Sequence, residues 1–218
     1  HYTFEQLKNS GGAYNFLISS VVPRPIALVS TVNKDGQVNC APFSYFNVMS
    51  HDPPLLVLGL NLNARSNTKK DTLNNIEQTG QFVVNIVSSW YLESANHCSG
   101  MFPPEANEIE LAGLTCLHST SVKPPRVAEA AVHFECEVIK PWIYTGYNDH
   151  NIHTVSIITG RILSFHAHES VLTADSIANP ERHCPIVDYT KLQPVGRLGG
   201  NTYTVVKDGI DLNRPKIK

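Results

Sequence analysis

Polar and aromatic side chains crowd into one short segment of the chain, residues 39–46, directly after a strand-like run. The segment reads NCAPFSYF and combines a proline, small polar groups and flat rings. It has neither the alternation of a half-buried strand nor the period of a helix, so we expect it to interrupt the strand and to leave backbone N–H and C=O groups free. Such groups, beside Asn39 and Ser44, are the parts needed to hold a planar, hydrogen-bonding heterocycle.

A second group of candidate residues lies at the apparent start of a helix predicted over residues 70–79. Lys70 and Thr72 stand in its first turn, where free N–H groups and the helix dipole favour an anion such as a phosphate. The alternative for Lys70 is a solvated lysine before a helix. Arg65 precedes the helix and could add a contact, and Arg24, between two prolines, either reaches the same phosphate or serves as a surface charge.

The elements that must position these residues are mostly strands. Apolar runs and alternation predict strands over residues 26–32, 38–41, 55–60, 82–87, 132–139, 154–165 and 203–206. Asp35-Gly36 predicts a hairpin turn between the first two, and Gly160 predicts a bulge or a close approach within a long strand. Short helices are predicted over residues 12–18 and 91–97, and Gly80 is expected to end the 70–79 helix. Many strands without a βαβ rhythm favour a barrel.

Composition limits the class of protein. A chain of 218 residues with 42% hydrophobic and 17% charged residues is expected to form one domain, residues 1–218. Its formal net charge of −2 without a basic block argues against nucleic acid as a partner. The sequence has no apolar run of membrane-spanning length and no signal-peptide pattern in its first ten residues.

The cysteine and histidine patterns point away from disulfides and metals. Five cysteines, without a Cys-x-x-Cys pair, predict free thiols and a reducing, cytoplasmic location, and alternation places Cys136 in the core. The closest histidine pairs, His150 with His153 and His166 with His168, lack a cluster of further ligands, so we expect no metal site. Two proline-rich excursions, residues 100–126 and 173–194, are candidates for shaping a substrate site.

Ordered motifs along most of the chain resemble the flavin reductase-like, FMN-binding split-barrel family, specifically its flavoprotein oxygenase subgroup. The matching pieces are PRPIALVST at 23–31, Asn39-x-Ala41-Pro42-Phe43-Ser44-x-Phe46, Asp52-Pro53-Pro54, Lys70-Asp71-Thr72, Asn75-Ile76, FVVN at 82–85, Gly160-Arg161-Ile162, and Arg197-Leu198-Gly199-Gly200 with Tyr203. The resemblance implies a mainly β fold with a few helices, an FMN-binding split β-barrel.

The resemblance also implies a set of FMN contacts. It brings Lys70, Thr72, Arg65 and Arg24 to the phosphate, a wall of Asn39, Ala41, Pro42 and Ser44 to the isoalloxazine ring, and further contacts from Ser30, Thr31, Gly199, Gly200 and Tyr203. Alternatives stay open: Asn39 could close a turn, the glycines could form an ordinary turn, and Phe46 is expected to be a core residue. His166 is a further candidate for tuning the flavin.

The implied activity is that of an FMN-dependent oxidoreductase of the flavin reductase type. Electrons would pass from NAD(P)H through FMN to free flavin, oxygen or an organic acceptor. The chain lacks a Gly-rich dinucleotide fingerprint, so NAD(P)H would bind transiently over the flavin. An FMN-dependent oxygenase and a non-catalytic FMN electron carrier are the alternatives. The family also implies a homodimer with FMN near its interface.

Overall fold

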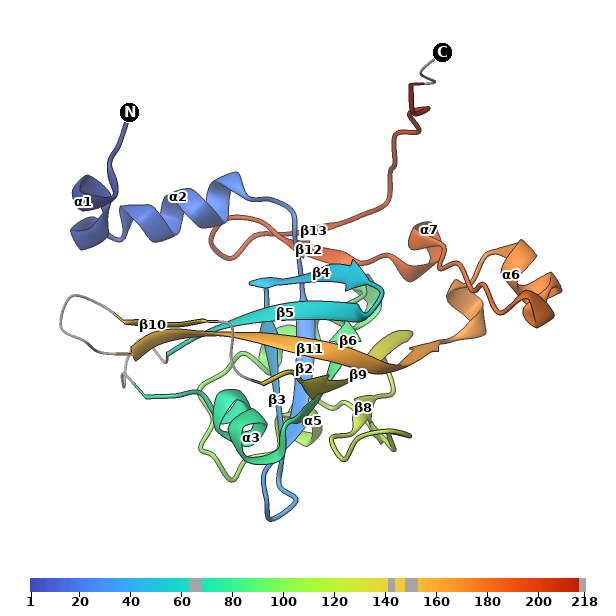
Figure 1. The fold of residues 1–218 in the computed structure, drawn as a ribbon, viewed down its shortest axis with the longest axis horizontal. Coiled ribbons are helices and arrows are strands. Elements are labelled where there is room, and N and C mark those ends of the chain that lie inside the picture. Colours follow the sequence, from blue (N-terminus) through green and yellow to red (C-terminus); the bar gives the residue numbers. More distant parts are fainter. Residues whose placement is uncertain (63–67, 141–143, 148–152, 216–218) are drawn as a thin grey trace.

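The computed structural model describes residues 1–62, 68–140, 144–147 and 153–215, and it is mainly β (Figure 1). The strands are β1 (Arg24–Pro25), β2 (Ala27–Val32), β3 (Val38–Phe43), β4 (Phe46–His51), β5 (Pro54–Asn61), β6 (Gln81–Ile86), β7 (Cys116–Leu117), β8 (Arg126–Val127), β9 (Val132–Val138), β10 (Tyr144–Tyr147), β11 (His153–Ala167), β12 (Val195–Arg197) and β13 (Tyr203–Val205). The helices are α1 (Phe4–Leu7), α2 (Gly12–Ser20), α3 (Asp71–Thr79), α4 (Leu92–His97), α5 (Glu108–Leu111), α6 (Ala174–Ala178) and α7 (Tyr189–Leu192).

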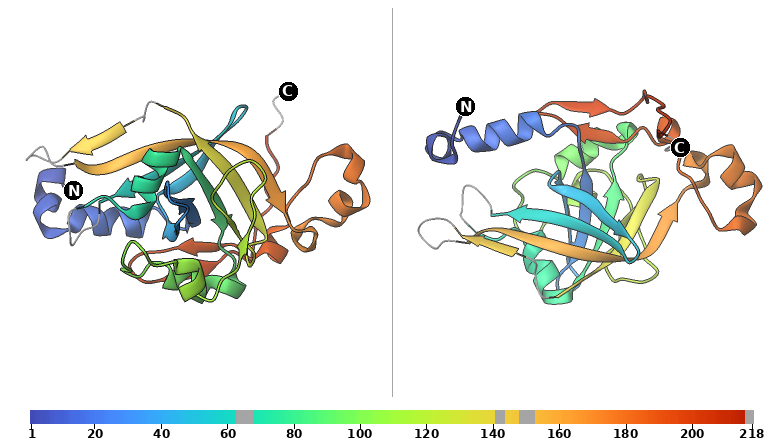
Figure 2. Two further views of the ribbon diagram at one scale, coloured as in Figure 1. Left: turned by 90° about the horizontal axis from the view of Figure 1, so that it is seen from below. Right: turned by 45° about the horizontal axis from the view of Figure 1, so that its top comes forward.

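One antiparallel sheet forms the body of the molecule. Its strands follow the order β3-β2-β6-β9-β11-β5-β4, and β10 pairs with β11 outside that path. The sheet curls around a core cluster built from its inner faces and from α3 (Figure 2). A smaller sheet, β1-β12-β13, carries the C-terminal strands, and α2 runs alongside it (Figure 1). The predicted split barrel with few helices is therefore confirmed.

The central strands are buried on both faces, as their apolar sequences predict. Every residue of β2 is buried, and Phe82 of β6 is fully enclosed. Gly160 of β11 faces Phe82, and a Cβ placed on Gly160 would lie 2.5 Å from the Phe82 Cζ atom. The close approach predicted for this glycine is confirmed. Phe46 and Cys136 are core residues, as predicted.

The expectation that residues 39–46 interrupt a strand is wrong for their first half. β3 continues to Phe43, and it keeps register with β2 from Val32↔Val38 to Ala27↔Phe43. Pro42 is tolerated because β3 is the edge of the large sheet, where a missing N–H breaks no ladder bond. Among the described residues, no strand pairs with the other edge of β3, so free backbone groups arise from its edge position and not from irregular structure.

Local turn signals are also confirmed. The β2–β3 hairpin turns at Asn33–Gly36, where Gly36 has a φ of 84° and the Gly36 N–H donates to the Asn33 carbonyl. Helix α3 ends at Gly80, whose φ of 70° is the left-handed geometry expected for a C-terminal glycine. The sequence did not predict β1, β4, β7, β8, β10, β12, α1 or α5 to α7. All of them except β4 have five residues or fewer, and β4 lacks a regular alternation of apolar and polar residues.

The two excursions have different positions. In the first excursion, residues 100–126, helix α5 packs against β3, and the β7–β8 pair at its end lies beside β6. Residues 173–194 form a lobe with α6 and α7 to one side of the barrel (Figure 1). In the part of the chain that the structure describes, no helix has the length and apolar character needed to cross a membrane.

Candidate functional site

One cavity lies between the edge strand β3, the start of α3 and the first excursion. It has a volume of about 520 Å³, within the range of small-molecule sites. Five predicted residues, Asn39, Ala41, Pro42, Lys70 and Thr72, line it together. Residues from the excursion close its other side, namely Gly100, Met101, Phe102, Pro104 and Glu108.

The start of α3 presents an uncapped helix terminus to this cavity. Lys70 is the N-cap residue, and its side chain makes no capping hydrogen bond. The first intrahelical bonds come from the N–H groups of Leu73 and Asn74 to the Lys70 carbonyl, so the N–H groups at the two preceding positions are left for another acceptor. The Lys70 ammonium is exposed and lies 5.9 Å from the centre of the Phe43 ring. The arrangement favours an anion at this end of the cavity.

Lys69 and Lys70 differ in their partners although they are neighbours. The Lys69 Nζ atom lies 2.7 Å from a carboxylate oxygen of Glu77. Among the residues that the structure describes, Lys70 has no ion-pair partner. Lys70 is therefore the lysine whose charge is available to a ligand.

A chain of buried amides and hydroxyls links β2, β3 and α3. The Asn39 Nδ2 atom donates to the Thr72 hydroxyl at 2.9 Å and lies 3.4 Å from the Thr31 hydroxyl. Asn75 donates to the same Thr31 hydroxyl at 3.1 Å. Thr31 is fully buried. Its hydroxyl therefore supports the Asn39–Thr72 pair from the interior and does not face the cavity. Asn39 does not close a turn, because it lies within β3 opposite Thr31.

Sequence reasoning missed the buried carboxylate of Glu108 beside the cavity. Its Oε2 atom accepts a hydrogen bond from the Cys40 N–H at 2.9 Å. This N–H group on the outer edge of β3 is therefore not available to a ligand. Burial raises the pKa of Glu108, and Asp71 raises it further, while the Cys40 N–H opposes the rise. Nothing in the acidic run around Glu108 distinguishes this residue, because its partner lies 68 positions away in the chain.

A smaller cavity of about 80 Å³ adjoins the first and shares Pro42, Phe43 and Ser99 with it. It brings together the predicted residues Ser44 and Tyr203, with Arg197. The Arg197 guanidinium lies over the Tyr203 ring, 4.5 Å from its centre, and also donates to the Tyr203 hydroxyl. The Tyr203 hydroxyl donates in turn to Asn96 at 2.6 Å. The C-terminal motif is therefore fixed against α4 at the end of the site.

Two residues predicted to contact FMN, Arg24 and Ser30, form hydrogen bonds with other parts of the protein interior instead. Arg24 is 6% exposed, so its reading as a surface charge is wrong. Its guanidinium donates to the carbonyls of Ile18, Val21 and Leu198 and lies 3.4 Å from the Ser44 hydroxyl, which joins α2 to the C-terminal strands. Ser30 is fully buried and donates to the Pro125 carbonyl.

The remaining predicted residues have mixed outcomes. Gly199 packs against helix α2, where an added Cβ would lie 3.4 Å from the Ser19 Cβ, and Gly200 turns the chain with a φ of 60°. Arg65 and the His150–His153 pair lie outside the residues whose side chains the structure describes. His166 lines a different cavity, with His168. Among the described residues, no group of three or more His, Cys, Asp or Glu side chains is arranged to hold a metal ion.

Comparisons with known proteins agree with this architecture. The family model described as the flavin reductase like domain matches residues 19–190. An uncharacterized protein of Aquifex aeolicus is 42% identical over 190 residues, which cover 87% of this chain and 88% of that protein.

Two solved structures are similar over almost their whole length. Nitrilotriacetate monooxygenase component B from Bacillus cereus has a TM-score of 0.84 at 31% identity and covers 97% of both chains. The 2-nitrobenzoate 2-nitroreductase NbaA of Pseudomonas fluorescens has a TM-score of 0.82 at 32% identity, over 100% of this chain and 98% of that one. On the family match and the fold together, the chain belongs to the flavin reductase-like domain family.

Proposed function

We propose that the cavity binds FMN and that the protein is an oxidoreductase of the flavin reductase type. Electrons would pass from NAD(P)H to free flavin, oxygen or an organic acceptor. The observation that carries the proposal is the meeting, in one cavity, of an anion-binding helix start and an edge strand with free backbone groups. FMN combines the two matching parts, a phosphate and a flat ring with hydrogen-bonding edges.

The residues present fit that cofactor. Lys70, the Thr72 hydroxyl and the first N–H groups of α3 would hold the phosphate. Asn39, Ala41 and Pro42 would line the ring along the β3 edge. Ser44, Tyr203 and the Gly199–Gly200 turn would bound the adjoining end of the site, and Arg65 belongs to the proposed phosphate contacts by its place in the sequence.

The chain contributes position and electrostatics to the proposed reaction. The bound flavin would supply the redox chemistry, accepting a hydride from the nicotinamide and passing electrons on. Lys70 would balance the phosphate charge, and Asn39 would orient the pyrimidine edge of the ring through its anchored amide. Glu108 keeps the β3 backbone in place through the Cys40 N–H. The proposal requires no side chain to act as an acid or a base.

The relatives support an oxidoreductase but differ in reaction. One is named as a component of a monooxygenase and another as a nitroreductase. An FMN-dependent oxygenase is therefore retained as the second candidate, and a non-catalytic FMN electron carrier as the third. A nitroaromatic compound is one example of the organic acceptor that the first candidate allows.

We further propose that the chain acts as a single domain and pairs as a homodimer in the cytoplasm. Helix α2 stands beside the barrel and exposes three large apolar side chains, Tyr14, Phe16 and Leu17, each more than half accessible. Met49 of β4 is 58% exposed as well. Such a surface is typical of subunit interfaces. The five free cysteines favour a reducing compartment.

Anaerobic absorbance spectroscopy tests the function. FMN-loaded protein is mixed with NADH or NADPH, and the loss of the oxidised-flavin band is followed over time. Rapid bleaching supports the reductase, and reoxidation by added free flavin, oxygen or a nitroaromatic compound identifies the acceptor. FMN that binds tightly but is not reduced by either nucleotide would favour the electron carrier instead. If the protein does not bind FMN, the proposed function is wrong.

A further inference from the structure

A second cavity adjoins the phosphate end of the proposed FMN cavity. Its volume is about 170 Å³, and it shares Asn39, Asp71 and Pro104 with the FMN cavity. Helix α3 and the β2–β3 hairpin supply the other lining residues, which are Asn33, Gln37, Val38, Asn74, Asn75 and Gln78. Because amide side chains form most of this lining, we call it the amide cavity. A ligand that extends beyond the phosphate of FMN would enter it.

The charged side chains differ between the two cavities. Asp71 borders both, but Lys69 and Lys70 line the FMN cavity alone. Asp71 is the one charged side chain among the described residues that line the amide cavity, and within that part of the chain its carboxylate accepts no hydrogen bond. A carboxylate accepts hydrogen bonds from sugar hydroxyls and repels a further phosphate. The part of a ligand that enters the amide cavity is therefore uncharged and carries hydroxyl groups.

Three amide side chains of this cavity have groups left for a ligand. The Asn74 amide has no hydrogen-bond partner among the residues described. The Gln37 carbonyl oxygen accepts from the Asn33 Nδ2 atom at 2.7 Å, and the Gln78 carbonyl oxygen accepts from the Lys34 N–H at 3.4 Å. The amide N–H groups of Gln37 and Gln78 have no partner in the described part of the chain. The cavity therefore offers more free donors than free acceptors.

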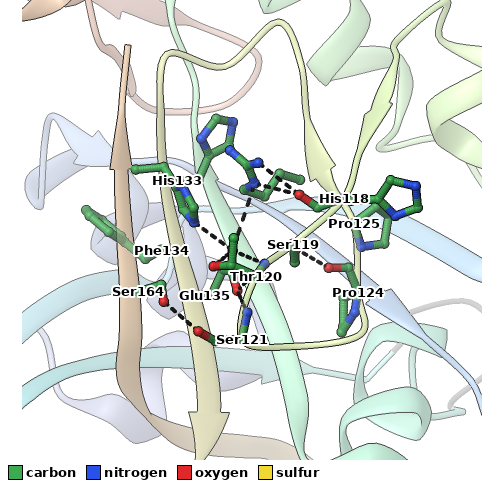
Figure 3. A network of polar contacts seen from close by, with 12 residues as sticks. His118, Ser119, Thr120, Ser121, Pro124, Pro125, His133, Phe134, Glu135 and Ser164 are labelled. Atoms are coloured by element: carbon green, nitrogen blue, oxygen red, sulfur yellow. Dashed lines mark hydrogen bonds and ion pairs between the residues drawn. The ribbon is translucent and has the colours of Figure 1, made fainter. Parts of the chain in front are cut away.

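The polar network around the buried Glu135 side chain provides a contrast (Figure 3). Its carboxylate accepts the N–H groups of Thr120 and Ser121, and the His166 Nε2 atom lies 2.6 Å from its Oε1 atom. The Ser121 hydroxyl is in turn paired with the Ser164 hydroxyl at 2.6 Å. These groups bind one another and so stabilise the loop that contains Thr120 and Ser121. The free amides beside α3 lack such partners and line a cavity.

Adenine matches the free groups of the amide cavity. It presents several ring nitrogens as acceptors and one exocyclic amino group as a donor, and Asn and Gln amides pair with its N6 and N7 positions. The free N–H groups of Gln37 and Gln78 suit the ring nitrogens, and the free Asn74 carbonyl suits the amino group. Val38 and Pro104 add apolar surface against which a flat base can lie. Asp71 then stands where a ribose would join the base to the phosphates.

We infer that the amide cavity binds the adenosine half of FAD. The inference rests on the proposed function, because the isoalloxazine ring and the first phosphate of FAD take the places proposed for FMN. The second phosphate follows at the start of α3, Asp71 accepts from the ribose, and adenine lies among the free amides. NAD(P)H does not fit this arrangement, because its nicotinamide must meet the flavin ring, whereas the amide cavity adjoins the phosphate end.

Calorimetric titration of the flavin-free full chain with FMN and with FAD tests the inference. We expect FAD to bind about tenfold more tightly than FMN, as one net hydrogen bond implies. Asn74→Leu keeps a good helix former of similar size but removes the amide, so it should lower the affinity for FAD to that for FMN and leave FMN binding unchanged. Asn74→Gln keeps an amide and should retain more of the preference for FAD than Asn74→Leu does.

Three results would overturn the assignment. One is FMN binding without any preference for FAD, which leaves the proposed function intact; if neither flavin binds, the proposed function is wrong as well. Another is an Asn74→Leu variant that unfolds at the parent temperature and prefers FAD as the parent does. The third is a higher KM for NADH in Asn74→Leu with an unchanged flavin preference, which would assign the cavity to the nicotinamide nucleotide. If Asn74→Leu does not fold, Gln78→Leu gives the same comparison.

Discussion

The Asn39 amide donates to the Thr72 hydroxyl at 2.9 Å and so ties the edge strand β3 to the first turn of α3. Asn39 stands in the proposed ring wall and Thr72 in the proposed phosphate site. The two parts are therefore joined by a direct hydrogen bond, and a change in one residue is expected to alter the position of the other. Thr31 completes the connection from β2.

Lys70→Ala is expected to weaken FMN binding without weakening the fold. It removes one charge-assisted bond to the phosphate, which corresponds to a loss of affinity on the order of 10- to 150-fold. The preference for FMN over riboflavin should fall in parallel. Fluorescence titration with both flavins measures the change. Lys69→Ala is the matched control, because Lys69 already pairs with Glu77; equal losses in the two variants would exclude a specific role for Lys70.

Asn39→Ala is expected to shift the reduction potential of bound FMN as well as its affinity. Hydrogen bonds to the ring edge stabilise the oxidised and reduced forms unequally, whereas phosphate contacts affect both almost equally. Potentiometry on Asn39→Ala, Thr72→Val and the double variant separates the roles. Because the two side chains are bonded to each other, we expect their effects on affinity to be non-additive. An unchanged potential in Asn39→Ala would assign Asn39 to positioning Thr72 alone.

His133 is expected to make the protein less stable in mild acid. Burial, together with Arg126 and His166, lowers the pKa of His133 from 6.5 to about 4, against the opposing effect of the Val127 carbonyl. Between these values the unfolded chain binds more protons than the folded one, so stability falls as the pH is lowered through that window. This residue should cost about 2–3 kcal/mol between about pH 7 and about pH 4.5.

Urea unfolding of the parent and of His133→Gln at the two pH values measures that contribution. The variant should lose less stability on acidification than the parent. Glu135 acts in the same direction, because a carboxylate with a lowered pKa loses its stabilising effect as the pH falls through its folded value. It is present in both proteins and so cancels in the comparison. Identical pH dependence would show that the pKa of His133 is the same in the folded and the unfolded state.

Gly160→Ala is expected to destabilise the barrel by about 1–3 kcal/mol, the usual cost of overpacking. The new methyl group would meet the enclosed Phe82 ring. Thermal and urea unfolding give the value. Phe82→Leu combined with Gly160→Ala provides the control, since the smaller side chain makes room and the double variant should lose less than the sum of the single ones. Simple additivity would mean that the two residues do not clash.

Phe16→Glu is expected to dissociate the proposed homodimer. Phe16 is 57% exposed on α2, and a carboxylate at an apolar subunit interface would be desolvated without a partner. Light scattering at micromolar concentration gives the mass of parent and variant. Ile177→Glu on α6 is the control, because Ile177 is 48% exposed on the separate lobe. A monomeric parent that still carries flavin would contradict the dimer.

The sequence by itself determined the features that depend on neighbouring residues. Apolar runs located β2 and β6, the helix start at Lys70 and the stop at Gly80 located α3, and the Asp35-Gly36 pair located the hairpin. The ordered motifs were sufficient to predict the family, and the alternation of apolar and polar residues was sufficient to predict that Cys136 is buried. Each of these signals is local, because backbone preference and side-chain period act over a few residues.

Only the tertiary structure decided which polar side chains face a cavity and which are buried behind it. Arg24 and Ser30 follow the family pattern, yet their donors are bound to carbonyls brought near by the fold. Glu108 meets the Cys40 N–H across 68 positions, and Glu135 meets His166 across 31. Partners so far apart leave no local signal, because it is strand order and loop packing that bring them together.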